Sequence, residues 1–161
     1  MTSTMRFDRW EDSTGALIAE GSAPRGIVTT TSGGTNGRGY SALASSVTSA
    51  GTTVDVLSMT FNATAGRLYR ASALLYIDTS VNSARYEIRF TDASNTTLKY
   101  IADQTNGTWA RAEKSVSHIF TASGSTTIKL RIGSVDGNMT VYGISSPDAQ
   151  VKFYIEDIGP A

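Results

Sequence analysis

Polar and apolar residues alternate with a period of two over most of the chain from residue 54 onward, and this alternation limits the fold more than any other feature. The clearest case is the segment 85–90, where even-numbered residues are apolar and odd-numbered residues are charged. The apolar side consists of Tyr86, Ile88 and Phe90. The charged side consists of Arg85, Glu87 and Arg89. Because successive side chains of a strand point to opposite faces, the segment is predicted to be a strand with one buried face and one wet face.

The same alternation predicts several more strands. Residues expected to face inward on two of them are Leu57, Met59, Phe61 and Ala63, and Tyr69, Ala71, Ala73, Leu75 and Ile77. Asn62 to Gly66 supplies the turn between these two strands. Further strands are expected around residues 98–101, 116–120, 128–132, 139–142 and 151–155.

Turn-forming residues separate the expected strands, at 92–95, 106–107, 123–125 and 136–138. Hairpins are the simplest interpretation of these positions. Asp136-Gly137 is the strongest of them, because Asp tolerates and Gly freely adopts the positive φ values of a type I′ turn. Short strands at this spacing, without helical periods between them, predict an antiparallel sandwich or barrel.

The first 53 residues follow a different pattern. Residues 17–20 and 26–30 are plausible short strands, 31–40 is a glycine-rich loop, and 41–50 is a weak candidate for a helical turn. We expect an irregular N-terminal arm over residues 1–25 that docks on partner chains, with Phe7 and Trp10 as its assembly contacts. The β-sandwich domain is then expected over residues 26–161.

Composition excludes several classes of protein. The chain has 161 residues and no cysteine, which fits one domain without disulfides or thiolate chemistry. Lys plus Arg equals Asp plus Glu at 14 each, so the basic patch of a nucleic-acid or anionic-membrane binder is not expected. Charged residues make up 17% of the chain, and 22 Thr and 20 Ser supply most of its polarity. No apolar run suits a signal peptide or a membrane span, so we expect a soluble protein made without export.

Catalytic candidates are few. Glu87 is flanked by Arg85 and Arg89, which favour its ionised form, so ion pairing is a better interpretation than a glycosidase acid. His118, the single histidine, shares a strand pattern with Val116 and Phe120 and is interpreted as an ordinary packed or edge residue. The glycine-rich residues 32–39 lack the ending of a phosphate loop. The sequence therefore predicts a protein that is not an enzyme.

Two other groups are candidates for ligand binding. Trp109 follows a turn, where it is slightly better explained as a lid on the core than as a platform for a sugar ring. With Arg85, Glu87 and Arg89 it forms our candidate glycan-binding face. Glu156 and Asp157 near the C-terminus, with Asp8, Glu11 and Asp12 near the N-terminus, supply oxygens for calcium if the termini meet. No known ligand spacing supports that site, so solvated termini are the better interpretation and no cofactor or metal is expected.

Several stretches resemble known jelly-roll proteins. Residues 116–121, 128–131 and 154–159, together with a Trp before a strand and a final acidic pair, resemble jelly-roll domains of the carbohydrate-binding-module type. The ending Ile155 to Gly159, the run Phe61 to Tyr69 and the opening Phe7 to Gly15 resemble domains of minor tail and fibre proteins of tailed bacteriophages.

The resemblance implies an antiparallel β-sandwich of jelly-roll type and a virion structural protein: a tail, fibre or capsid-decoration protein. Such proteins commonly assemble as symmetric oligomers with other virion proteins, and some contact host-surface glycans. Assembly in the host cytoplasm and location in the virion are the corresponding expectations. A stand-alone carbohydrate-binding module is the alternative, and a small glycoside-active enzyme is the least favoured.

Overall fold

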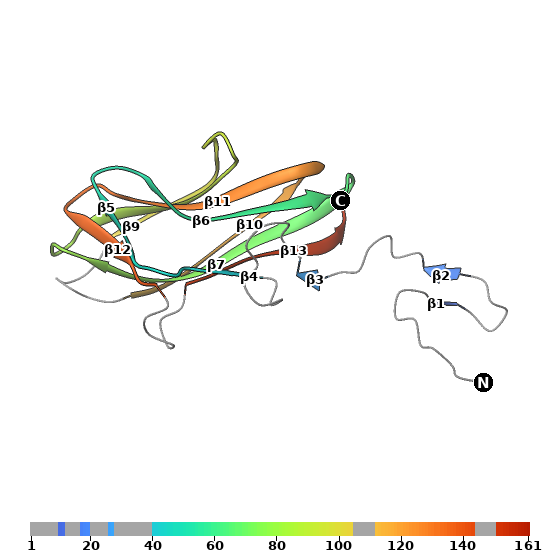
Figure 1. The fold of residues 1–161 in the computed structure, drawn as a ribbon, viewed down its shortest axis with the longest axis horizontal. Helices are drawn as coiled ribbons and strands as arrows, with labels where there is room; N and C mark the ends of the chain where they lie inside the picture. Colours follow the sequence, from blue (N-terminus) through green and yellow to red (C-terminus); the bar gives the residue numbers. More distant parts are fainter. Residues whose placement is uncertain (1–9, 12–16, 20–25, 28–39, 105–111, 144–150) are drawn as a thin grey trace.

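The protein is an all-β sandwich of two antiparallel sheets, as the computed structural model shows (Figure 1). The structure describes residues 10–11, 17–19, 26–27, 40–104, 112–143 and 151–161. Thirteen strands lie in this part of the chain. Their bounds are β1 Trp10–Glu11, β2 Leu17–Ala19, β3 Gly26–Ile27, β4 Tyr40–Ala42, β5 Val47–Ala50, β6 Val54–Ala63, β7 Arg67–Thr79, β8 Arg85–Thr91, β9 Thr97–Gln104, β10 Ala112–Thr121, β11 Gly124–Ser134, β12 Asn138–Val141 and β13 Lys152–Pro160.

The order of the strands is that of a jelly roll. One layer contains β6-β11-β8-β9, and the other contains β5-β12-β7-β10. Four antiparallel pairs build both layers: β5 with β12, β6 with β11, β7 with β10, and β8 with β9. The four pairs are nested around the β8–β9 hairpin, as in a long two-stranded antiparallel ribbon. Rolling up such a ribbon into two sheets produces the jelly roll. The predicted jelly-roll fold class is therefore confirmed.

The remaining strands extend the second layer into a seven-stranded sheet. One edge of β7 pairs with β10, and the opposite edge pairs with β13 and then with β12. Ile77 of β7 shows this arrangement, because it pairs with Ala112 of β10 on one side and with Val141 of β12 on the other. β3 and β4 pair in turn with β13. β1 and β2 pair with each other and belong to neither layer.

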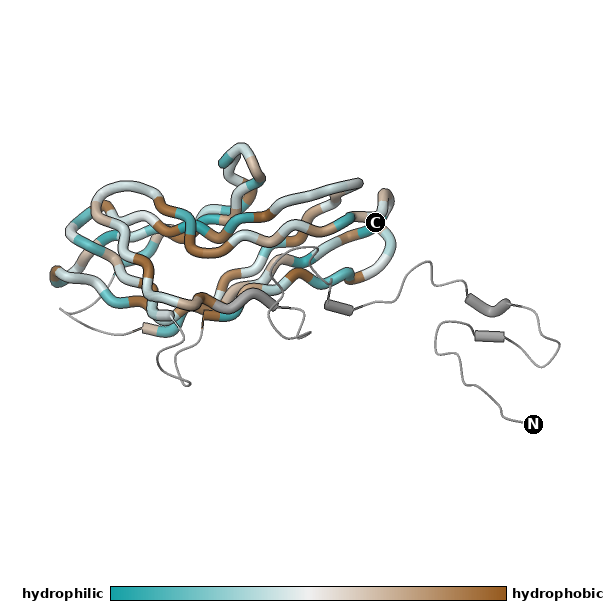
Figure 2. Tube along the Cα trace, viewed as in Figure 1, coloured by the Kyte–Doolittle hydropathy of each residue, from teal (hydrophilic) through white to brown (hydrophobic). Residues whose placement is uncertain are grey.

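The core lies between the two layers, where apolar side chains from both sheets pack together. Figure 2 shows hydrophobic positions along the strands of both layers. Tyr86, Ile88 and Phe90 are 1%, 2% and 0% exposed, so the alternation predicted for 85–90 is confirmed on its apolar side. The inward residues predicted for β7 are all buried, as are Met59, Phe61 and Ala63 on β6. Leu57 is only partly buried. A register shift at this point lets Val56 join the core as well, which a strict period of two does not anticipate.

Two predicted hairpins are wrong. The turns at 123–125 and 136–138 each lead the chain from one sheet to the other, so the strands they join do not pair. The turn predicted at 62–66 is present, with Gly66 at a φ of 76°, and it also connects the two sheets. Residue 137 has a φ of 71°, but Asp136 lacks the positive φ that a type I′ turn needs. Turn residues dictate a reversal of the chain, and packing of the two sheets then decides which strands become neighbours. The predicted hairpin at 92–95 is confirmed, with Asn95 at a φ of 69°.

Within the N-terminal third, short strands at 17–19 and 26–27 are confirmed. The helical turn proposed for 41–50 is wrong, because β4 and β5 occupy this stretch. Both strands complete the edge of the seven-stranded sheet, and that pairing outweighs the weak local helical tendency. The glycine-rich loop predicted at 31–40 lies outside the described residues except for Tyr40, which begins β4, and the turn predicted at 106–107 lies outside them as well.

Candidate functional site

The candidate site lies on the outer face of the four-stranded sheet, where β8 turns its charged side away from the core. Cross-strand pairing sets two rows of residues on this face. One row is Gly133, Glu87 and Ala102, and the next is Arg131, Arg89 and Tyr100. Neighbouring strands lie about 4.8 Å apart, so residues of one row are in contact distance of each other.

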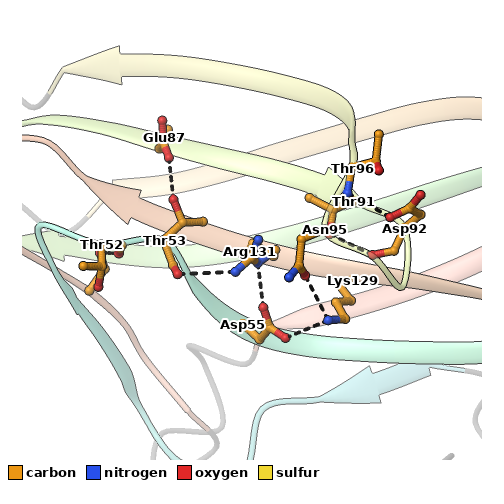
Figure 3. A network of polar contacts seen from close by, with 11 residues as sticks. Thr52, Thr53, Asp55, Glu87, Thr91, Asp92, Asn95, Thr96, Lys129 and Arg131 are labelled. Carbon is orange, nitrogen blue, oxygen red and sulfur yellow. Dashed lines mark hydrogen bonds and ion pairs between the residues drawn. The ribbon is translucent and has the colours of Figure 1, made fainter.

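Glu87 is buried although it points outward, and this corrects the prediction of a wet position. The residue is 9% exposed, because its side chain lies flat across Gly133. A Cβ at position 133 would lie 2.5 Å from the Glu87 Oε1 atom, so only glycine leaves room for this arrangement. Thr53 Oγ1 donates a hydrogen bond to Oε1 at 2.9 Å, and Arg89 Nη2 donates one to Oε2 at 2.7 Å (Figure 3 shows the Thr53 contact).

These contacts keep the Glu87 carboxyl ionised. Burial by itself raises the pKa of Glu87, but the hydrogen bonds from Arg89 and Thr53 and the Arg89 charge outweigh it and hold the pKa below its ordinary value. The prediction that an arginine neighbour keeps Glu87 ionised is confirmed. Arg89 supplies this effect, and Arg85 does not contact the carboxylate.

Tyr100 completes the group. The Arg89 guanidinium carbon lies 5.2 Å from the centroid of the Tyr100 ring, which is a cation–π distance. Tyr100 is 50% exposed, more than any other aromatic residue whose side-chain exposure is described. A carboxylate, a guanidinium and a half-exposed phenol ring therefore stand in sequence on one sheet face.

A second polar group continues this face toward β6 and the β8–β9 turn (Figure 3). Asp55 accepts a hydrogen bond from Arg131 Nε at 2.6 Å and pairs with Lys129 Nζ at 3.3 Å. Arg131 also reaches the Thr53 carbonyl at 3.4 Å, and Lys129 donates to Asn95 Oδ1 at 2.9 Å. Thr53 thus touches both groups and couples them.

Arg85 is on the same strand face but turns to a different partner. Its Nε and Nη2 atoms donate to Asp136 at 2.7 and 3.2 Å. The Asp136 pKa is lowered by the Arg85 side-chain hydrogen bond first, and the Arg85 pKa is raised in return. Of the three charged residues predicted from β8, the structure brings Glu87 and Arg89 together and leaves Arg85 in a separate pair.

Trp109 and Phe7 lie outside the described residues, and Trp10 is placed only as part of strand β1. Their predicted roles stay predictions. Tyr100 and Thr53 belong to the site but were not predicted from the sequence. Tyr100 was within reach, because the confirmed turn at 92–95 places it opposite Arg89 once the hairpin is drawn.

Two of the five candidate calcium ligands, Asp157 and Glu156, have arginine partners, whereas Asp8 and Asp12 lie outside the described residues and Glu11 is placed only as part of strand β1. Asp157 is 8% exposed and accepts two hydrogen bonds from Arg67, so the expectation of a solvated C-terminal acid is wrong for this residue. It faces inward on β13, where the chain brings Arg67 beside it. Glu156 faces outward and pairs with Arg70 at 2.7 Å. Within the described residues, no three His, Asp or Glu side chains gather as a metal site would require.

His118 lies on edge strand β10, half-buried, with its ring stacked 6.2 Å from that of Phe120. Burial lowers its pKa first, and the charge of Lys99 lowers it further. The interpretation as an ordinary edge histidine is confirmed. The described part of the chain contains no helix long and apolar enough to cross a bilayer.

No protein-family model and no curated protein matches this sequence. Among solved structures, it is similar to the Eiger TNF protein from S. frugiperda, with a TM-score of 0.49 and 10% identity over 85% of this chain and 92% of that chain. It is also similar to VP2 of the infectious bursal disease virus subviral particle, with a TM-score of 0.41 and 17% identity over 76% of this chain and 37% of that chain. A family 35 carbohydrate-binding module from an environmental isolate gives a TM-score of 0.36 and 17% identity over 86% of this chain and 90% of that chain.

Proposed function

We propose that this protein is a non-enzymatic structural component of a bacteriophage particle, a tail, fibre or capsid-decoration protein, whose four-stranded sheet contacts host-surface glycan. The observation that carries the glycan contact is the Glu87–Arg89–Tyr100 group on the outer face of that sheet. The assembly role follows from the resemblance to phage tail and fibre domains described above.

The three side chains supply what a sugar ring needs from a binding surface. The half-exposed ring of Tyr100 offers an apolar face against which the C–H side of a pyranose packs. Arg89, with a side chain 31% exposed, presents donors to sugar oxygens. Each oxygen of the ionised Glu87 carboxylate can accept more than one hydrogen bond, so a ligand hydroxyl has an acceptor beside the ring.

Preorganisation favours binding at this group. Arg89 and Glu87 already hold each other at 2.7 Å, and Thr53 fixes the second carboxylate oxygen. A ligand therefore does not have to order these long side chains, which lowers the entropic cost of binding.

The same contacts support a role that is not enzymatic. Glycoside hydrolysis needs one carboxylic acid whose pKa is raised enough to donate a proton. The described carboxyls with a shifted pKa are Glu87, Asp103 and Asp136, and each is shifted downward. Each of them is held as an anion by a cationic partner.

The β1–β2 pair supports assembly through the N-terminal arm. Its strands have two and three residues and pair only with each other among the described strands. An isolated two-stranded hairpin is marginal in water, so contact with another virion protein through Phe7 and Trp10 would stabilise it.

Binding to a glycan array tests the glycan contact. We expect the wild-type chain to bind a defined subset of glycans, and Tyr100→Ala to weaken the best of them at least tenfold in a calorimetric titration. Val135→Ala is the matched control, because Val135 is 55% exposed and lies beside Arg85, outside the Glu87–Arg89–Tyr100 group. Equal binding by Tyr100→Ala and the control, or no binding by the wild type, would refute the contact.

Co-sedimentation with phage particles that lack the protein tests the virion role. The wild-type chain should bind the particles, and the Phe7→Ala/Trp10→Ala variant should bind them at least tenfold more weakly. Glycan binding without any particle binding would instead favour the alternative of a stand-alone carbohydrate-binding module.

A further inference from the structure

Strand β10 presents an edge that natural β-proteins rarely leave unprotected. Its ten residues pair with β7 along the whole length without a register shift. Among the described strands, none pairs with its other edge. Such edges are normally blunted by bulges, prolines or outward lysines, because free N–H and C=O groups recruit other strands.

Apart from the charge of Glu113 near its start, β10 has none of these devices on its outer face. The residues that face outward are Glu113, Ser115, Ser117, Ile119 and Thr121. Ile119 is 54% exposed, among the most exposed of the large apolar side chains described. The strand has one lysine, Lys114, which turns inward and pairs with Asp103 of β9 at 2.5 Å. Its charge is therefore neutralised and does not repel an approaching strand.

We propose that β10 is a homodimer interface at which two copies of this chain pair their β10 strands antiparallel, centred on Ser117. This surface is distinct from the arm and from the glycan-contacting face, so it goes beyond the function proposed above. A twofold axis perpendicular to the seven-stranded sheet then joins the two sheets into one continuous sheet.

The sequence of β10 is self-complementary in this register. Ser117 faces Ser117 of the partner subunit, Ser115 faces Ile119, and Glu113 faces Thr121, so no like charges oppose each other on the outer face. Thr121 can donate a hydrogen bond to the Glu113 carboxylate. All nine residues from 113 to 121 are paired, and each exposed Ile119 is covered by the opposite strand.

The second layer is consistent with the same axis. A perpendicular twofold places the four-stranded sheets of both copies on the same side of the joined sheet. β9, which meets β10 through the Asp103–Lys114 pair, then lies beside its copy across the flank. On the core-facing side of β9, away from Tyr100, residues Thr97, Lys99 and Asp103 are exposed in the single chain. Dimerisation would cover part of that flank.

Cysteine crosslinking of the full chain tests both the interface and its register, because the protein has no cysteine of its own. Opposed residues in an antiparallel pair have Cα atoms about 4.5–5.5 Å apart, which suits a disulfide. Ser117→Cys should therefore form a covalent dimer on mild oxidation. Ser115→Cys is the matched control, since it lies on the same face but about 13 Å along the strand from its own copy.

We expect Ser117→Cys to crosslink at least tenfold faster than Ser115→Cys, and sedimentation equilibrium to show a reversible wild-type dimer. Ser117→Glu, which opposes two carboxylates on the axis, should weaken that dimer at least tenfold more than Ser115→Glu. The Phe7→Ala/Trp10→Ala variant should keep the dimer. A wild-type chain that is monomeric at every concentration, equal crosslinking of the two cysteine variants, or a dimer that crosslinks only at Ser115→Cys would each overturn the proposal.

Discussion

The Arg67–Asp157 and Arg85–Asp136 ion pairs consist of the same two residue types, arginine and aspartate, but differ greatly in their exposure to solvent. Both are bidentate, with Nε on one carboxylate oxygen and Nη2 on the other. The side chains of Arg67 and Asp157 are 7% and 9% exposed, whereas those of Arg85 and Asp136 are 64% and 41% exposed. Glu87 and Arg89 lie between these extremes at 12% and 31%.

Position in the fold explains this difference. Asp157 is on the inward side of β13 and Arg67 begins the neighbouring strand β7, so the sandwich closes over both. Asp136 belongs to a turn at the rim, where water reaches the pair. Because removal of one partner leaves a buried charge uncompensated but leaves an exposed charge hydrated, the same mutation should have unequal effects along this series.

Asp157→Asn should have the largest effect. It removes the carboxylate that accepts two hydrogen bonds from the buried Arg67 guanidinium, and we expect the melting temperature to fall by about 10 °C. Differential scanning calorimetry at pH 7 measures the change. An Arg67→Met/Asp157→Leu double variant is the control, since it removes both charges and should recover part of the loss. A change of about 1 °C or less for Asp157→Asn would show that burial does not rank these pairs.

Glu87→Gln should cause the second-largest fall in melting temperature, and the size of this fall should depend on pH. The folded-state pKa of Glu87 is below its ordinary value of 4.5, so its charge stabilises the fold above that pH. We expect the variant to melt about 4 °C below the wild type at pH 7. This difference should shrink as the pH falls below 4.5 and through the folded pKa, where the wild-type carboxyl is also protonated.

Melting curves of both proteins from pH 7 to pH 2 measure that convergence. A gap that widens on acidification would mean that Glu87 is stabilised as the neutral acid, contrary to its contacts with Arg89 and Thr53.

Gly133→Ala should act on the same carboxylate through space. The new methyl group would lie 2.5 Å from Oε1 and 2.8 Å from Cγ of Glu87, so the side chain must lift off the sheet. We expect a loss of about 3 °C in melting temperature. In a Glu87→Ala background the same substitution should cost almost nothing, because the clashing atoms are gone. A cost that is equal in both backgrounds would locate the strain in the backbone of β11.

The sequence predicted the layers of this fold better than its connections. Alternation in β7 and β8 identified which residues enter the core, because a period of two maps directly onto the faces of a strand. Glycine and aspartate at 136–137 predicted a reversal but not its destination, because the partner of β11 is chosen by packing between the sheets. The same limit applies to β4 and β5, whose sheet partners β13 and β12 lie about a hundred residues away in the sequence.

The candidate site was predictable in part for the same reason. Glu87 and Arg89 share a strand, so their common face follows from spacing alone. Burial of Glu87 did not follow, because it depends on Gly133 being its cross-strand partner, and that register is set by the rolled ribbon. For Arg85 the spacing was misleading. It placed Arg85 in a group with Glu87, but Arg85 pairs with Asp136 in the turn after β11.

Asp136→Asn should have the smallest effect and therefore fixes the lower end of the series. Both partners are exposed, and hydration replaces most of what the ion pair contributes. We expect a fall of about 1 °C or less in 150 mM salt, with the residual difference removed at 1 M salt, where charges are screened over about 3 Å. Arg85→Gln should behave in the same way, and the double variant should add nothing further. A fall as large as that of Asp157→Asn would mean that the 136–138 crossing, rather than the burial of its ion pair, determines how the two sheets hold together.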